Sequence, residues 1–299
     1  MASAWWQERE KGGEFALKLT AFLVATLPKI LLKPIVFCVS FCYHLACKNE
    51  RENINFYLDL LHKRGVKTRG AFRSFYEFSL AICDKFRVWS GKISLNDIDI
   101  KNLERIKKEF ESRKQGQIML VSHFGNTDIA SALHSKVSWL GEITILLYSK
   151  HAAKFARALK NAGASGVKIF EVDELDINTM IRLKEIIQSG GHIGVMGDRT
   201  PINGKSARIS FLGRECEFPV GAFLLAGILE TKISSFWAVS KNGRYEVSVE
   251  NIADCVRLGR DKMQSAQKYL EIYVRLLERK CEAYPHQFFN FYDFWLVRE

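Results

Sequence analysis

Short apolar runs alternate with helical patterns between residues 117 and 196, and this alternation is the strongest constraint on the fold. The runs are rich in aliphatic and β-branched residues and predict strands over residues 117–121, 142–147, 167–172 and 192–196. Helical patterns over 151–161 and 176–188 lie between them. Strands that alternate with helices of this length are typical of βαβ units and a parallel sheet. We therefore expect an α/β fold with a largely parallel central sheet flanked by helices.

The remaining segments extend this pattern on both sides. Helical spacing of apolar residues predicts further helices over residues 50–90, 101–114, 221–229 and 260–282. Residues 91–100 are expected to form a turn or short connection. Two more strands are predicted over 232–239 and 245–249, and the Asn-Gly pair at Asn242 and Gly243 indicates a hairpin between them. The length of 299 residues allows one large domain or two ordinary ones.

Residues 19–47 are nearly all apolar, but they do not form a clean transmembrane span. Their longest stretch without lysine or arginine, residues 34–47, is shorter than the roughly 20 residues that cross a bilayer. We expect a kinked helix lying in one leaflet, with Lys29 and Lys33 reaching lipid phosphates. A buried core helix is the alternative. The chain then divides into an N-terminal membrane-associated helical segment, 1–48, and an α/β domain, 49–299.

The net charge of +11 favours anionic partners, and phospholipid headgroups, an acidic carrier protein and nucleic acid all fit that description. Nucleic-acid binding would need a basic stripe interleaved with exposed aromatic residues, or a known module. Neither is evident, so we expect no nucleic-acid partner. The seven cysteines form no C-x-x-C pair. Their spacing predicts reduced thiols in a reducing compartment, with neither a disulfide framework nor a metal site.

A histidine, His123, and a carboxylate, Asp128, follow the first predicted strand, which ends at Val121. On one continuous helix, His123 and Asp128 would point about 140° apart, so they can meet only if a helix begins between them. Asn126 is a candidate N-cap that places Asp128 in the first turn, and Gly125 allows the sharp turn. An ionised Asp128 that accepts from one imidazole nitrogen would leave the other nitrogen as a general base for a hydroxyl group.

A second group of candidates lies beyond the fourth predicted strand. Ligand sites in parallel sheets lie at the carboxyl ends of the strands, where both His123 and Asp198 fall. Arg199 is the candidate for stabilising an oxyanion, with Asp198 holding its guanidinium in place, and a surface salt bridge is the alternative. Lys205 and Arg208, in the next loop, are candidates for holding a phosphate or a phosphopantetheine arm.

The chain resembles the lysophospholipid acyltransferase superfamily and, within it, the branch of bacterial lipid A biosynthesis (lauroyl or myristoyl) acyltransferases. The resemblance covers nearly the whole chain, including the hydrophobic N-terminal segment. Its motifs are Ser122-His123-Phe124-Gly125-Asn126-Thr127-Asp128 as the H-x-x-x-x-D box, Gly197-Asp198-Arg199, Phe211-Leu212-Gly213, Phe218-Pro219-Val220-Gly221 and Tyr284-Pro285-His286-Gln287-Phe288. Two positions depart from the pattern of the lipid A enzymes, which commonly have glutamate at Asp128 and tend to have tryptophan at Asn290.

The resemblance implies transfer of a fatty acyl group from acyl carrier protein or coenzyme A to a hydroxyl of a lipid or glycolipid. His123 would be the general base and Asp128 would orient it, with no covalent enzyme intermediate and no cofactor. It also implies the bacterial inner membrane, with the catalytic domain facing the cytoplasm, and membrane lipids and acyl carrier protein as partners. Two alternatives stay open: a non-catalytic basic lipid-binding membrane protein, and a lipid or thioester hydrolase that uses the same pair of residues.

Overall fold

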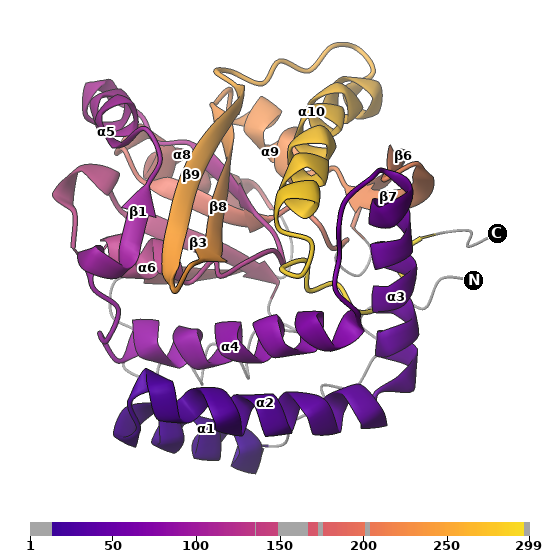
Figure 1. Ribbon diagram of the computed structural model, residues 1–299. Coiled ribbons are helices and arrows are strands. Elements are labelled where there is room, and N and C mark those ends of the chain that lie inside the picture. Colours follow the sequence, from indigo (N-terminus) through magenta and orange to yellow (C-terminus); the bar gives the residue numbers. More distant parts are fainter. Residues whose placement is uncertain (1–13, 135, 149–166, 173–175, 201–203, 296–299) are drawn as a thin grey trace.

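A seven-stranded sheet forms the centre of the molecule (Figure 1). The structure is a computed structural model that describes residues 14–134, 136–148, 167–172, 176–200 and 204–295. In spatial order the strands are β1 (Ile98–Ile100), β9 (Arg244–Ala253), β8 (Ile233–Lys241), β2 (Ile118–Val121), β5 (His192–Met196), β3 (Ile143–Tyr148) and β4 (Val167–Val172). The predicted helix over 151–161 lies outside the described residues.

The sheet is mostly parallel, which confirms the predicted α/β fold class. Strands β8, β2, β5, β3 and β4 pair in parallel, and β9 runs antiparallel to β8. The predicted hairpin is the β8–β9 connection, where Asn242 and Gly243 have φ of +51° and +84°. Positive φ at both central residues is what a two-residue hairpin turn of this kind requires. A separate hairpin is formed by β6 (Ser206–Phe211) and β7 (Arg214–Pro219).

Helices cover both faces of the sheet because its strands are apolar on both sides. On β2, Ile118 and Leu120 join one hydrophobic core while Met119 joins the other, as the two-residue period of a strand dictates. The first core is shared with α8 (Ile177–Gln188), α9 (Gly221–Ile228) and α10 (Lys262–Ala283). The second is shared with α5 (Leu103–Ser112) and α6 (Ile129–His134), and short 3₁₀ turns at Leu95–Asp97 and Ser138–Leu140 flank it.

Four more helices precede the sheet. They are α1 (Glu14–Thr26), α2 (Lys29–Ala46), α3 (Lys48–Lys63) and α4 (Ala71–Trp89). Figure 1 shows α4 lying across one end of the sheet, with α1 and α2 as a further layer on its far side. The predicted helical region 50–90 is therefore two helices, and the connection expected over 91–100 contains the short strand β1.

The N-terminal apolar segment breaks at Pro28, between α1 and α2, and α2 continues through Pro34. Of the helices in the described ranges, α2 is long and apolar enough to cross a membrane. It buries a narrow stripe, Leu32, Val36 and Ser40, and leaves most of its other side chains exposed. The Lys29 ammonium lies 3.5 Å from the Asp84 carboxylate of α4, so a lipid phosphate would share it with Asp84, and the expectation that Lys29 reaches lipid phosphates stays a prediction.

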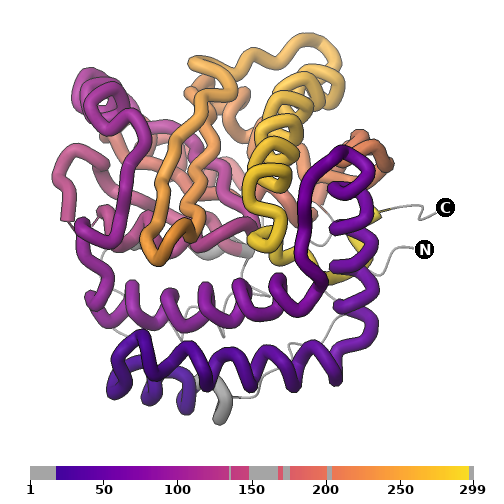
Figure 2. The backbone as a smooth tube through the Cα atoms, viewed as in Figure 1, coloured from indigo at the N-terminus to yellow at the C-terminus, as the bar shows by residue number. Residues whose placement is uncertain are grey.

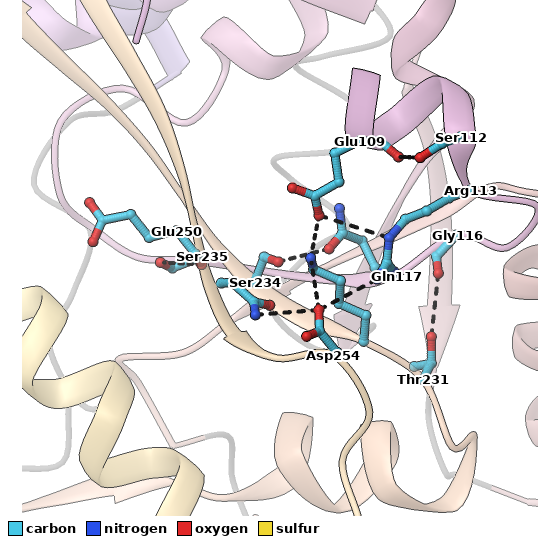
Figure 3. Close-up of polar contacts among 12 residues, drawn as sticks. Glu109, Ser112, Arg113, Gly116, Gln117, Thr231, Ser234, Ser235, Glu250 and Asp254 are labelled. Carbon is cyan, nitrogen blue, oxygen red and sulfur yellow. Dashed lines mark hydrogen bonds and ion pairs between the residues drawn. The ribbon is translucent and has the colours of Figure 1, made fainter. Parts of the chain in front are cut away.

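A polar cluster ties α5 to the amino ends of β2 and β8, and Figure 3 shows its contacts. The buried Lys232 ammonium pairs with Glu109 of α5 and lies 3.3 Å from Asp254. The Ser234 hydroxyl donates to Gln117 Oε1 over 2.8 Å. A buried cation needs such partners because desolvation of a lone charge is costly. The cluster therefore fixes the base of the sheet and leaves its carboxyl edge for ligands.

Candidate active site

The ends of β2 and β5 set the position of the site. Val121 and Met196 are paired in the parallel ladder, and the Gly197 N–H extends that ladder by donating to the Val121 carbonyl over 2.8 Å. His123 and Asp198 each lie two residues beyond this pair. Because parallel neighbours advance together, the two side chains emerge next to each other at the carboxyl edge of the sheet.

His123 is held by Asp198 in two ways. The His123 backbone N–H donates to Asp198 Oδ2 over 2.7 Å, and imidazole Nδ1 lies 3.2 Å from both carboxylate oxygens. Asp198 is fully buried, whereas about a third of the His123 side chain (34%) is exposed. With Nδ1 carrying its proton toward the carboxylate, Nε2 keeps a free lone pair. Within the described part of the chain, Nε2 has no hydrogen-bond partner.

The electrostatics keep this pair in the protonation states that a general base needs. Burial of the ring and the nearby Arg199 cation lower the pKa of His123, and the attraction of Asp198 only partly opposes them. Burial alone would raise the pKa of Asp198, but His123, Arg199 and Asn290 together hold it below its usual value. A neutral imidazole therefore faces an ionised carboxylate near pH 7.

Asp128 points to a different partner from the one expected. Its Oδ2 lies 3.1 Å from the Lys85 ammonium, and its Oδ1 accepts from the Trp89 indole N–H over 3.2 Å, both from α4. Among the described contacts, none joins Asp128 to His123, so the expected orienting hydrogen bond is not formed here. The reason is topological: α4 offers a cation and an indole at the start of α6, while β5 delivers Asp198 directly beside the imidazole.

The turn itself lies where the spacing of the sequence requires it. Gly125 has φ of +66°, and a Cβ built there would meet the Ala238 carbonyl oxygen at 2.1 Å. The Asn126 side-chain oxygen accepts from the Asp128 N–H over 3.2 Å, and α6 begins at Ile129. This contact has the form of the cap predicted for Asn126, but it closes a turn that precedes the helix. The turn begins between His123 and Asp128, as the spacing requires, whereas α6 begins after Asp128, so Asp128 lies just before the helix and not in its first turn as predicted.

The C-terminal segment, residues 284–295, closes the site. It lies so far from His123 in the sequence that the spacing of residues could not predict this contact. Figure 2 shows this yellow segment leaving α10 and passing close to α4. Its backbone pairs with the turn: the Gly125 N–H donates to the Gln287 carbonyl over 2.9 Å, and the Phe289 N–H donates to the His123 carbonyl over 2.7 Å. The turn is thereby held by β8 on one side and by this segment on the other.

Asn290 is a site residue that the sequence reasoning missed. Its buried amide donates to Asp198 Oδ2 over 2.8 Å, and its oxygen accepts from Arg199 Nε over 2.7 Å. The guanidinium also lies over the Tyr292 ring, at 5.4 Å from its centroid. Asn290 therefore links Asp198 to Arg199, where a direct ion pair was expected. Two signals in the sequence could have revealed it: Asn290 is one of two polar residues in the aromatic run 288–295, and it departs from the tryptophan that the resembled enzymes tend to have there.

The remaining candidates lie apart from this group. Arg208 is on β6 and lies 3.8 Å from Glu217, with both side chains largely exposed. Lys205 is also exposed, at the start of the same hairpin. In the ranges that the structure describes, no contact joins either residue to His123. The structure thus brings together His123, Asn126, Asp198 and Arg199, and it leaves Lys205 and Arg208 on the surface.

Residues 20–296 match the family model described as bacterial lipid A biosynthesis acyltransferase. No curated protein sequence matches the chain. The matched range includes α2, the turn after β2, the end of β5 and nearly all of the C-terminal segment, so every element that builds the site lies within it.

Proposed function

The chain belongs to the bacterial lipid A biosynthesis acyltransferase family and is therefore an acyltransferase, and we propose that it moves a fatty acyl group from an acyl thioester to a hydroxyl of a lipid or glycolipid acceptor. The observation that carries this proposal is the contact between the neutral His123 imidazole and the buried Asp198 carboxylate. It leaves Nε2 free to accept a proton from an incoming hydroxyl.

In the proposed reaction, the acceptor hydroxyl gives its proton to His123 Nε2 while its oxygen attacks the thioester carbonyl carbon. The tetrahedral intermediate collapses, the C–S bond breaks, and the imidazolium returns the proton to the leaving thiolate. Asp198 stabilises the imidazolium through Nδ1, as a buried carboxylate does in other acyl-transfer sites. Arg199, fixed by Asn290, supplies positive charge near the developing oxyanion.

We assign Asp128 a different task in this mechanism, which is to hold the catalytic turn against α4. Its bonds to Lys85 and Trp89 fix the residue that immediately precedes α6, only a few residues after His123. Asp128 then acts on the imidazole through the backbone, whereas Asp198 acts on it directly.

We further propose that the enzyme works at the cytoplasmic side of the bacterial inner membrane. The support is the exposed apolar side of α2 and the adjoining α1, where Ile30, Leu31 and Phe37 are more than half exposed. A surface of this kind is typical of interfacial helices. The net charge of +11 suits both an anionic leaflet and an acidic acyl carrier protein as the thioester donor, and acyl-CoA is the alternative donor.

The proposed activity is tested by incubating the full chain with inner-membrane lipids and a thioester donor whose acyl group is radiolabelled. The donor is either acyl carrier protein or coenzyme A loaded with that acyl group. Label appearing in a more highly acylated lipid supports acyl transfer, and a rate that depends on the carrier protein identifies the donor. Label released as free fatty acid would show a hydrolase instead. Unchanged donor, with lipid binding intact, would indicate a non-catalytic lipid-binding protein.

A further inference from the structure

A cavity of about 360 Å³ lies between the N-terminal helices and the catalytic turn. Its walls come from four sources: α2 and α4, the turn at Gly125 and Asn126, the tip of the β8–β9 hairpin, and the C-terminal segment at Gln287 and Phe289. Figure 1 shows how α4 separates the α1–α2 layer from the sheet, with the hairpin tip directed at α4. The cavity is therefore next to the site described above, yet it opens among residues that the proposed chemistry does not use.

Two lysines of α2 line this cavity. Lys29 and Lys33 are four residues apart, so they lie on the same side of the helix. Lys33 is exposed, and no carboxylate among the described residues pairs with it. The Lys29 ammonium lies 3.5 Å from Asp84, and its side chain is 36% exposed.

The Lys29 ammonium can be shared with a ligand, because Asp84 has other partners. Asp84 Oδ2 accepts from the Tyr245 hydroxyl over 2.8 Å, and Asp84 Oδ1 lies 3.6 Å from Arg87 Nε. Arg73 also lines the cavity, but it pairs with Glu77 one turn along α4. The positive charge left over at the cavity is therefore that of Lys33 together with a shared Lys29, which suits an anion of one or two charges.

We propose that this cavity binds the phosphorylated headgroup of a membrane lipid. The same helix exposes Ile30, Leu31 and Ile35, which are 76%, 52% and 37% exposed. When those side chains enter the acyl layer, lysines on the adjoining side of the helix lie at the depth of the lipid phosphates. A phosphate at that depth reaches the cavity without leaving the membrane surface.

The cavity also communicates with the catalytic turn. Asn126 lines it, and the Asn126 amide donates to the Tyr245 hydroxyl over 3.3 Å, which in turn donates to Asp84. Two hydrogen bonds therefore join Asp84, which also contacts Lys29, to the turn that carries His123. The bound lipid is either the acyl acceptor or a surrounding anionic phospholipid, and both present the same phosphate chemistry.

The binding test uses the full chain and a short-chain lipid that stays monomeric, dihexanoyl phosphatidic acid, with titration calorimetry as the readout. Lys33→Gln should weaken its binding about tenfold, the usual effect of losing one charge-assisted hydrogen bond. Lys48→Gln is the matched control, because Lys48 is exposed on α3 outside the cavity and removes the same charge. Equal weakening by both variants would overturn the proposal, as would equally tight binding of uncharged dihexanoylglycerol.

Two further measurements on Lys33→Gln distinguish the source of the phosphate. A raised KM for the lipid acceptor at unchanged kcat assigns the cavity to the acceptor headgroup. Weaker co-sedimentation with phosphatidylglycerol vesicles at unchanged KM assigns it to the surrounding lipid. No change in either measurement overturns the proposal. The inference rests on the proposed membrane association and not on acyl transfer. If the chain binds phosphatidic acid but transfers no acyl group, the cavity is still a headgroup site and only the proposed activity is refuted.

Discussion

The protonation state of a single residue, His123, governs the proposed chemistry. As a base it works only while Nε2 is unprotonated, so kcat/KM should fall as the pH falls through its pKa. That pKa lies below the ordinary value of 6.5, because burial and Arg199 disfavour the imidazolium. Asp198 opposes this shift. Activity should therefore persist into mildly acidic conditions before it declines.

Replacing Asp198 tests which carboxylate serves the imidazole. Asp198→Asn removes the charge that stabilises the imidazolium, so kcat should fall by about two orders of magnitude or more, and the acid limb of the pH profile should move to lower pH. Asp128→Asn is the matched control, since it removes a carboxylate that contacts Lys85 and Trp89. Its acid limb should stay in place. The reverse pattern, with the limb moved by Asp128→Asn alone, would restore Asp128 as the orienting residue.

The turn also requires a residue without a side chain at position 125, because there is no room for a Cβ. Gly125→Ala should destabilise the fold by more than the roughly 1–2 kcal/mol that a left-handed backbone costs a residue with a side chain, because its Cβ would overlap the Ala238 carbonyl. Gly91→Ala is the control: Gly91 has φ of +69° and no neighbour within 4 Å of a Cβ. Urea unfolding compares the two. Equal destabilisation would mean that the close approach to β8 is not needed.

At the scale of elements, the buried His192 and the half-buried His286 connect neighbouring segments, and each must be neutral to do so. His192 Nδ1 accepts from the Gln117 N–H, which joins β5 to β2, and His286 Nε2 accepts from the Arg69 N–H, which joins the C-terminal segment to the loop before α4. Burial lowers the pKa of each from 6.5 to about 4. Their contribution to stability is thus fully present above pH 6.5.

As the pH falls from about 6.5 to about 4, the unfolded chain takes up protons that the folded chain cannot, so the free energy of unfolding should decrease. Urea titrations at several pH values across this range measure the change. His286→Gln should make the decrease shallower, because one of the two groups is gone. A free energy of unfolding that stays constant or rises across this range would contradict the assignment.

The elements also show what could be predicted from the sequence. The strands that carry the site and the β8–β9 hairpin follow from local patterns, as does the turn at Gly125 and Asn126. The contact between His123 and Asp198 does not, because it depends on β5 lying next to β2 although β3 and β4 come between them in the chain. Asn290 is more remote still, since its place depends on how the C-terminal segment returns to the turn. Strand β1 was missed because three residues give no usable period.

At the scale of the whole molecule, the α1–α2 layer is expected to hold the enzyme on the membrane. Replacing Ile30, Leu31 and Ile35 by serine removes exposed apolar groups and leaves the buried stripe at Leu32 and Val36 intact. The variant should bind inner-membrane vesicles more weakly, because each of these side chains favours the membrane by roughly 0.3–0.6 kcal/mol, about 1–2 kcal/mol in total, while serine does not. Flotation on a density gradient measures the bound fraction.

Ile177→Ser is the control for this prediction, because Ile177 is equally exposed, at 79%, but lies on α8 away from the α1–α2 layer. It should float with the vesicles as the unaltered protein does. Undiminished flotation of the triple variant would show that the apolar side of α2 is not the membrane contact, and it would favour attachment through charge alone.

The account as a whole depends on His123 being the base in acyl transfer, and the most direct test is the rate of His123→Ala. With radiolabelled acyl thioester and lipid acceptor, the account predicts a loss of about two to four orders of magnitude in kcat, at an unchanged melting temperature and unchanged vesicle binding. A variant that folds, binds vesicles and still transfers acyl groups within about tenfold of the original rate would contradict it.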